Sequence, residues 1–183
     1  IYEYLLITYI ILFPGVAIVA SADSKAMKGV ELYKKQAFDQ ASQKFLEARE
    51  GKPNDPKISY NLGNSRYKQG KFEKALQDYS SSLDHKTNSA MKQKSAYNMG
   101  NTLYRMNKLE ESIAAYKKSL ELDPNDMDAK FNLEFVRKKN KEKQAEQQKK
   151  NKSEKDKKDQ GPNNQKNQNQ KNNKNSQKDQ NKK

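Results

Sequence analysis

The chain of 183 residues contains no cysteine, no tryptophan and a single histidine. The absence of cysteine excludes disulfides, thiolate zinc sites, a cysteine nucleophile and a lipid-modified N-terminal cysteine. One histidine is too few for a histidine metal cluster and argues against a histidine-dependent catalytic triad. Hydrophobic residues make up 32% of the chain, below the apolar share of about 45–50% in globular proteins. A single core running the whole length is therefore not expected.

Motifs of nucleotide binding and hydrolysis are also missing, because the sequence has no P-loop and no G-x-G-x-x-G, H-E-x-x-H or G-x-S-x-G. His85 falls near the end of an expected helix, where histidines usually contact terminal carbonyls or solvent. Asp123, Asp126 and Asp128 lack the spacing and the closing glutamate of an EF-hand and are better explained as turn and helix-start residues. The sequence therefore predicts no catalytic residues, no metal site and no cofactor.

Residues 1–22 form an apolar zone in which Glu3 carries the one charge. The run Leu5–Ala20 ends in Ala20-Ser21-Ala22, an A-x-A cleavage signature that indicates a secretory signal peptide. No Lys or Arg precedes the run, and about 20 apolar residues also suffice to cross a bilayer. Two interpretations stay open: a cleaved signal peptide of an extracytoplasmic protein, or an uncleaved membrane anchor.

Residues 141–183 contain 14 Lys, 9 Asn and 9 Gln, and their one apolar side chain is Ala145. This composition cannot offset the entropy of ordering, so we expect a disordered tail after a helix that continues from Arg137 to about Gln148. The 14 lysines against 6 acidic residues give the tail a net charge of +8, out of +14 for the chain. Such a tail either solvates the protein or contacts an anionic surface. Without Arg or aromatics it predicts no sequence-specific nucleic-acid binding.

Between these zones, residue types recur at offsets of 34 and then 37 residues. The recurring types are a glycine, then an aromatic and then a small residue: Gly29, Gly63 and Gly100; Phe45, Tyr79 and Tyr116; Ala48, Ser82 and Ser119. This recurrence indicates an internal repeat.

The two most complete copies, Tyr60-Asn61-Leu62-Gly63-Asn64 and Tyr97-Asn98-Met99-Gly100-Asn101, resemble the tetratricopeptide repeat, a helix–turn–helix unit of 34 residues. The resemblance implies an all-α fold, an α-solenoid within residues 23–140. In the helix pairs that it implies, the recurring glycine removes a side chain where the two helices approach most closely, and the aromatic fills the space between them. Its repeats are expected at 22–55, 56–89 and 93–126, followed by a capping helix at 127–140. Glu134 stands where the repeats have glycine, and a charge there predicts that no further helix packs on the cap.

Solenoids of this family bind extended peptides or partner helices on the concave face lined by the first helix of each repeat. Repeat positions 2, 5, 9, 12 and 13 share that face. The expected partner-binding residues are Lys57, Tyr60, Asn64, Tyr67, Lys68, Lys94, Tyr97, Asn101, Tyr104 and Arg105. Tyrosines supply rigid contact area, asparagines can hold a peptide backbone, and the basic residues favour an acidic segment or a C-terminal carboxylate. Alternatively, the tyrosines and asparagines only pack the helix pairs.

Some relatives bind chaperone tails through a carboxylate clamp, and Asn64 and Asn101 resemble its asparagine pair. Tyr60, Asp128 and Asn132 stand at three positions where the clamp has basic residues. We therefore expect no such clamp here.

The apolar N-terminal zone, the run Asp126–Glu134 and the Lys/Asn/Gln-rich tail together resemble the tetratricopeptide members of the bacterial Bat aerotolerance group, the BatC/BatE type. This resemblance implies a non-enzymatic adaptor in a cell-envelope complex, in the periplasm or on the inner membrane, whose partner is a von Willebrand factor A-domain Bat protein. An alternative function is a polyanion or membrane-surface tether that acts through the basic tail.

Overall fold

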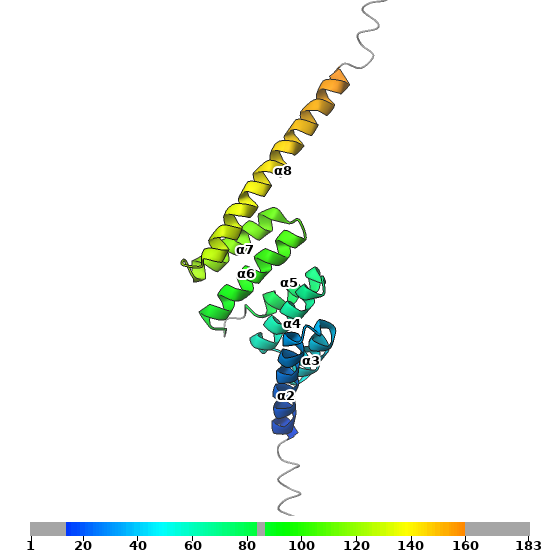
Figure 1. Ribbon diagram of the computed structural model, residues 1–183, viewed down its shortest axis with the longest axis vertical. Coiled ribbons are helices and arrows are strands. Elements are labelled where there is room, and N and C mark those ends of the chain that lie inside the picture. Colours follow the sequence, from blue (N-terminus) through cyan, green and yellow to red (C-terminus); the bar gives the residue numbers. More distant parts are fainter. Residues whose placement is uncertain (1–13, 84–86, 160–183) are drawn as a thin grey trace, which may run out of the picture. The chain divides into compact units, whose positions relative to one another are not determined.

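The computed structural model describes residues 14–83 and 87–159, and all regular elements in this part of the chain are helices (Figure 1). They are α2 (Pro14–Lys34), α3 (Phe38–Gly51), α4 (Pro56–Lys68), α5 (Phe72–Ser81), α6 (Ser89–Arg105), α7 (Leu109–Leu122) and α8 (Met127–Asp159). The expected all-α fold is confirmed for these residues. Residues 90–92, which the repeat alignment leaves between two copies, lie in the first turn of α6.

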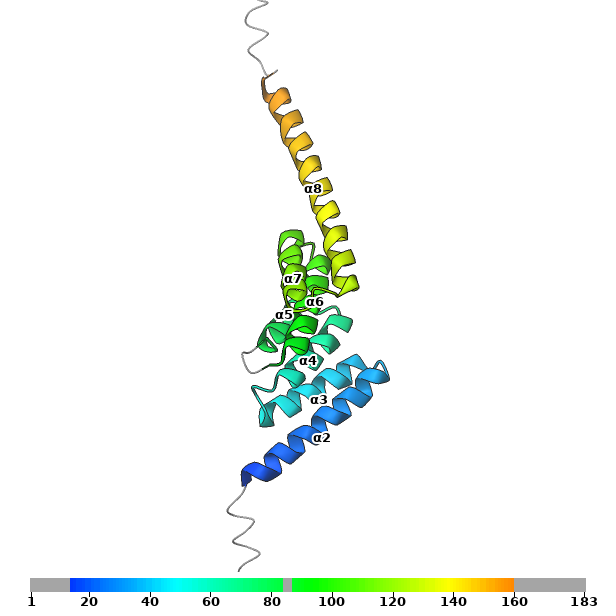
Figure 2. The ribbon, with the colours of Figure 1, turned by 90° about the vertical axis from the view of Figure 1, so that its left-hand side faces the viewer.

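Helices α2 to α7 form three pairs, α2 with α3, α4 with α5 and α6 with α7, and each pair packs on the next (Figures 1 and 2). The turn inside each pair has one residue with a left-handed backbone: Gln36 at φ 61°, Gly70 at φ 73° and Asn107 at φ 57°. The three occupy equivalent repeat positions. The same short turn therefore joins both helices in every pair, although only one copy uses the glycine that tolerates this conformation best.

The core of each pair is an aromatic ring that lies against a glycine of the facing helix. A Cβ atom added to Gly63 would lie 2.8 Å from the ring of Tyr79, and one added to Gly100 would lie 2.7 Å from that of Tyr116. Both tyrosines are almost fully buried. The close approach predicted from the recurring glycines is confirmed, because any side chain at these positions would collide with the ring.

Polar side chains begin the first helices of the later units. The Asp55 carboxylate accepts hydrogen bonds from the backbone amides of Lys57 and Ile58 at the start of α4. Asn88 accepts one from Met91 in α6, and Asp126 accepts one from Ala129 in α8. These contacts satisfy amide groups that have no partner within the helix. The helix-start interpretation is confirmed for Asp126.

The first turns of α8 close the end of the stack of pairs. Leu133 and Val136 are buried in one cluster with Leu109 and Tyr116 of α7. Glu134, which stands where the repeats have glycine, is exposed. The chain divides into two compact parts. The first contains the helix pairs and ends at Lys138, and the second unit begins at residue 139.

The described part of that second unit, residues 139–159, is helical, so α8 extends further than the expected end near Gln148. The remainder of the tail predicted to be disordered, residues 160–183, lies outside the described residues, as do His85 and residues 1–13. Residues 14–22 form the first part of α2, and Ala22 is buried. No helix within the described ranges is both long and apolar enough to cross a membrane.

Candidate functional site

The ten residues predicted to bind a partner lie on α4 and α6, the first helices of two neighbouring pairs. We call the surface they form the groove face. Lys57, Lys68, Lys94 and Arg105 are exposed, whereas the tyrosines and asparagines of the set are partly buried. The structure thus divides the set into a charged, solvated part and a polar part that also contacts the protein.

The polar part is a hydrogen-bonded cluster that joins two pairs of helices. The Oδ1 atom of Asn64 accepts one hydrogen bond from the Tyr79 hydroxyl and one from Asn98 Nδ2, both at 2.9 Å. Asn98 Nδ2 also donates to the Tyr60 hydroxyl at 3.3 Å. One amide of α6 thereby connects two groove-face side chains of α4.

The same cluster recurs one repeat further along the chain. Asn101 Oδ1 accepts from the Tyr116 hydroxyl at 2.7 Å and from Asn132 Nδ2 at 3.3 Å. Asn132 Nδ2 donates to the Tyr97 hydroxyl at 3.0 Å. Two successive units thus use the same residue types at the same positions for the same contacts.

These contacts decide which way the groove-face amides point. In Asn64 and Asn101 the carbonyl end is held by the protein, and among the described residues neither Nδ2 donates a hydrogen bond to the chain. Each amide can therefore offer its two N–H groups to a ligand. The recipient would be an acceptor such as the carbonyl oxygen of a peptide backbone.

The tyrosines of the cluster contribute both packing and hydrogen bonding. The ring centroids of Tyr60 and Tyr79 are 6.0 Å apart, and those of Tyr97 and Tyr116 are 5.8 Å apart. Burial raises the pKa of Tyr79 and of Tyr116 well above the usual value, and the neighbouring tyrosines add to the shift. Both hydroxyls therefore keep their protons at neutral pH and donate to the asparagines. The packing role that the sequence left open for these residue types is present in the structure.

The charged residues of the groove face are all basic, and acidic side chains of the described part of the chain do not neutralise the lysines among them. Within the described ranges, Lys57, Lys68 and Lys94 form no ion pair. Arg105 lies over the ring of Phe72, 5.5 Å from its centroid. These cations are available to carboxylates of a ligand.

Sequence reasoning missed two sets of residues that belong to this face. Asn98 and Asn132 share the sixth repeat position, one step from the positions used for the prediction, and the repeat alignment could have shown them. Phe131 and Phe135 of α8 occupy positions 5 and 9, those of Tyr60 and Asn64 in α4, and both are exposed.

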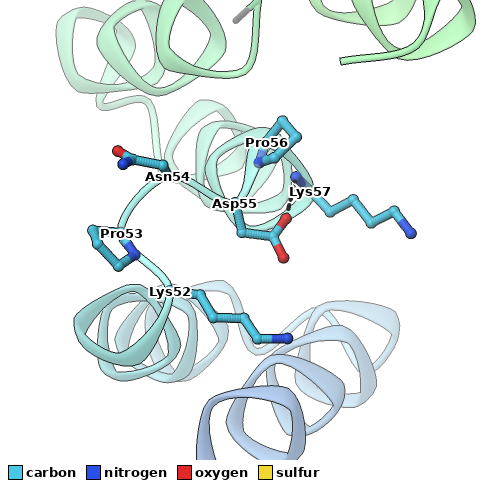
Figure 3. Close-up of a pocket in the computed structure, with 6 residues that line it drawn as sticks. All are labelled: Lys52, Pro53, Asn54, Asp55, Pro56 and Lys57. Atoms are coloured by element: carbon cyan, nitrogen blue, oxygen red, sulfur yellow. Dashed lines mark hydrogen bonds between the residues drawn. The ribbon is translucent and has the colours of Figure 1, made fainter. Parts of the chain in front are cut away.

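A concavity outside the groove face lies at the turn between α3 and α4, lined by Lys52, Pro53, Asn54, Asp55, Pro56 and Lys57 (Figure 3). Its carboxylate is already used, because Asp55 caps α4. Lys52 forms an ion pair with Asp23 of α2. Lys52 and Asp55 therefore already have partners within the chain, and fewer polar groups are left for a ligand at this turn than on the groove face.

Comparison with known proteins agrees with this architecture. Models described as "Tetratricopeptide repeat" and "TPR repeat" match residues 94–126 and 29–70. No curated protein sequence matches the chain.

Similar solved structures include the first such domain of Spaghetti (RPAP3) bound to an HSP90 peptide, at 23% identity and TM-score 0.59, covering 66% of this chain and 93% of that one. The Sgt2 domain of Aspergillus fumigatus has 20% identity and TM-score 0.61, with 68% and 82% covered. The TPR2AB domains of yeast Sti1 in an HSP90 complex have 24% identity and TM-score 0.62, with 69% and 50% covered. Given its helix pairs, its glycine–aromatic contacts and these matches, the chain contains tetratricopeptide repeats.

Proposed function

We propose that this chain is a non-enzymatic interaction scaffold that holds an extended segment of a partner protein along α4 and α6. The observation that carries the proposal is the pair of equivalent amides, Asn64 and Asn101, whose carbonyl ends are fixed by the protein. Their N–H groups can bind two carbonyl groups of one peptide backbone. A peptide bound along both helices would need no change in the packed helix pairs.

The unpaired lysines of the groove face favour a partner segment with acidic residues. Two of the similar structures, those of Spaghetti and Sti1, contain HSP90 ligands, so this fold can hold such a segment. The present chain has Tyr60, Asp128 and Asn132 at three positions that are basic in a carboxylate clamp. The proposal therefore specifies an acidic segment and not a chaperone tail.

The cellular setting belongs to the same proposal. The apolar run before Asp23 and its A-x-A signature support export, and the resemblance to the Bat group supports an adaptor in a bacterial envelope complex. Its partner would be a von Willebrand factor A-domain Bat protein, in the periplasm or at the inner membrane.

An affinity capture from an envelope extract of the native host tests this function. The baits are the full chain, a charge-reversal variant Lys57→Glu with Lys94→Glu, and a matched control Lys74→Glu with Lys117→Glu. All four lysines are exposed, and the control pair lies on α5 and α7, the second helices of their pairs. Both double variants change the net charge equally and leave the hydrogen-bonded cluster of tyrosines and asparagines intact.

We expect the full chain and the control to retain one partner protein that the groove-face variant loses. Retention of an A-domain protein would in addition support the envelope assignment. Equal loss from both variants, or capture that disappears in moderate salt and follows residues 141–183, would contradict the groove and favour an electrostatic tether.

A further inference from the structure

Helix α2 differs from α4 and α6 at the positions that form the groove face. Positions 5 and 9 hold Tyr60 and Asn64 in α4, and Tyr97 and Asn101 in α6, whereas in α2 they hold Ala26 and Val30. Smaller apolar side chains replace a ring and an amide. The first pair therefore lacks the hydrogen-bonded cluster and has space in its place.

That space is a cavity of about 600 Å³ between α2 and α4. Its apolar lining comes from Ala26, Met27, Val30 and Ile58. Met27 is 73% exposed and Val30 36%, so the apolar surface is accessible from solvent. A cavity of this size and character has room for an aliphatic side chain.

The charged groups around the cavity are not equally available. Asp23 is paired with Lys52, Glu31 is held by Lys28 and Lys35, and Asp55 caps α4. By contrast, Lys34 and Lys57 also line the cavity and form no ion pair with any described residue. The charge left over at the rim is therefore positive.

Resting on the proposed function, we propose that this cavity is a specificity pocket for an aliphatic side chain that adjoins a carboxylate in the partner segment. The aliphatic group fills the space between Ala26, Val30 and Ile58, and the carboxylate pairs with Lys34 or Lys57. The partner's backbone then continues along α4 and α6. The chain's own tail, with its net charge of +8, has the wrong charge for this rim.

The test uses a displayed library of random twelve-residue peptides selected on the full chain. Parallel selections use the variant Ala26→Tyr with Val30→Asn, which introduces the residues that α4 and α6 carry at these positions. A matched control, Ala114→Tyr with Ser80→Asn, also introduces one tyrosine and one asparagine, but at exposed positions of α7 and α5. The groove-face variant Lys57→Glu with Lys94→Glu completes the set.

We expect the wild type and the control to select peptides with acidic residues and one aliphatic residue at a fixed spacing. The pocket variant should retain the acidic preference and lose the aliphatic one. In a selected peptide, changing the aliphatic residue to Ala should weaken binding to the wild type about ten- to a hundredfold, and binding to the pocket variant less than about threefold. Free and amidated C-termini distinguish a side-chain carboxylate from a terminal one.

An unchanged aliphatic preference in the pocket variant, with binding still abolished by Lys57→Glu and Lys94→Glu, would overturn the pocket and leave the proposed function standing. Binders that are insensitive to the groove-face variant, or no binders at all, would contradict the proposed function itself. Competition by a peptide of residues 160–183 would overturn the assigned charge of the ligand.

Discussion

The Nδ2 atom of Asn98 on α6 lies 2.9 Å from the Oδ1 atom of Asn64 on α4 and donates a hydrogen bond to it. Asn132 on α8 makes the equivalent contact with Asn101 on α6. A single residue type at one repeat position therefore both joins successive units and orients the side chain that faces the proposed ligand. This dual role distinguishes Asn98 from a residue that only packs.

The first prediction concerns Asn98→Ala. The change removes the donor to Asn64 Oδ1 and to the Tyr60 hydroxyl, so the free energy of unfolding should fall by about 1 kcal/mol. The matched control is Asn61→Ala, at the same repeat position in α4, whose side chain makes no hydrogen bond within the described part of the chain. Asn61→Ala should change the free energy of unfolding by less than about 0.5 kcal/mol. Urea denaturation measures both, and equal losses would contradict a connecting role for Asn98.

The second prediction uses the glycine–aromatic contact in the first pair. A Cβ added at Gly29 would lie 2.8 Å from the Phe45 ring, so Gly29→Ala should cost about 1–3 kcal/mol of unfolding free energy despite alanine's higher helix propensity. In a Phe45→Leu background the same change should cost about 0.5 kcal/mol or less, because the ring is gone. Thermal or urea unfolding of the four proteins gives the coupling. Additive effects would mean that the ring does not set the glycine requirement.

The third prediction concerns Asp78, which is buried on α5 and pairs with Arg66 at 2.7 Å and with Arg49 at 3.1 Å. Burial raises the pKa of its carboxyl, and the two guanidinium groups oppose that shift. Asp78→Ala leaves Arg66 largely buried without its partner and should lower the unfolding free energy by about 2–3 kcal/mol. Asp39→Ala, which removes the exposed pair with Lys71, should cost less than about 1 kcal/mol. Urea unfolding measures both variants. Equal losses of unfolding free energy would show that the buried ion pairs of Asp78 stabilise the fold no more than an exposed pair does.

The fourth prediction concerns alkaline pH. Because burial raises the folded-state pKa of Tyr79 above the ordinary value of 10.0, the unfolded chain releases this proton first. The stabilisation is complete below pH 10 and is lost as the pH rises above it. The free energy of unfolding should therefore fall between about pH 10 and pH 11.5, and less steeply in Tyr79→Phe.

Tyr104→Phe is a suitable control for that measurement. It removes a partly buried hydroxyl that makes no hydrogen bond to another described residue. It leaves the hydrogen bond from the Tyr79 hydroxyl to Asn64 in place, so it shows how far any loss of a tyrosine hydroxyl changes the curve. A Tyr79→Phe curve parallel to the wild type would show that other groups cause the alkaline loss.

Much of the fold followed from the repeat that residue spacing reveals and from its resemblance to the tetratricopeptide repeat. Gly63 and Tyr79 recur in step with Gly100 and Tyr116, and a helix pair with a ring against a glycine is the arrangement that needs both. Each of these contacts joins two residues of the same repeat, so its pattern is visible within a short stretch of sequence. The left-handed turns were harder to predict. A glycine marks such a turn in the sequence, but two of the three turns have Gln36 and Asn107 at this position.

The sequence by itself determined the all-α repeat architecture, the close helix approach at the glycines and the basic character of the groove face. Tertiary structure decided which side chains are free to act there. Asn64 and Asn98 are both asparagines on first helices, and spacing alone does not show which of them donates to the other. The cavity beside Ala26 and Val30 likewise depends on the distance between α2 and α4. Both features arise between repeats, where the position of one helix depends on the packing of all its neighbours.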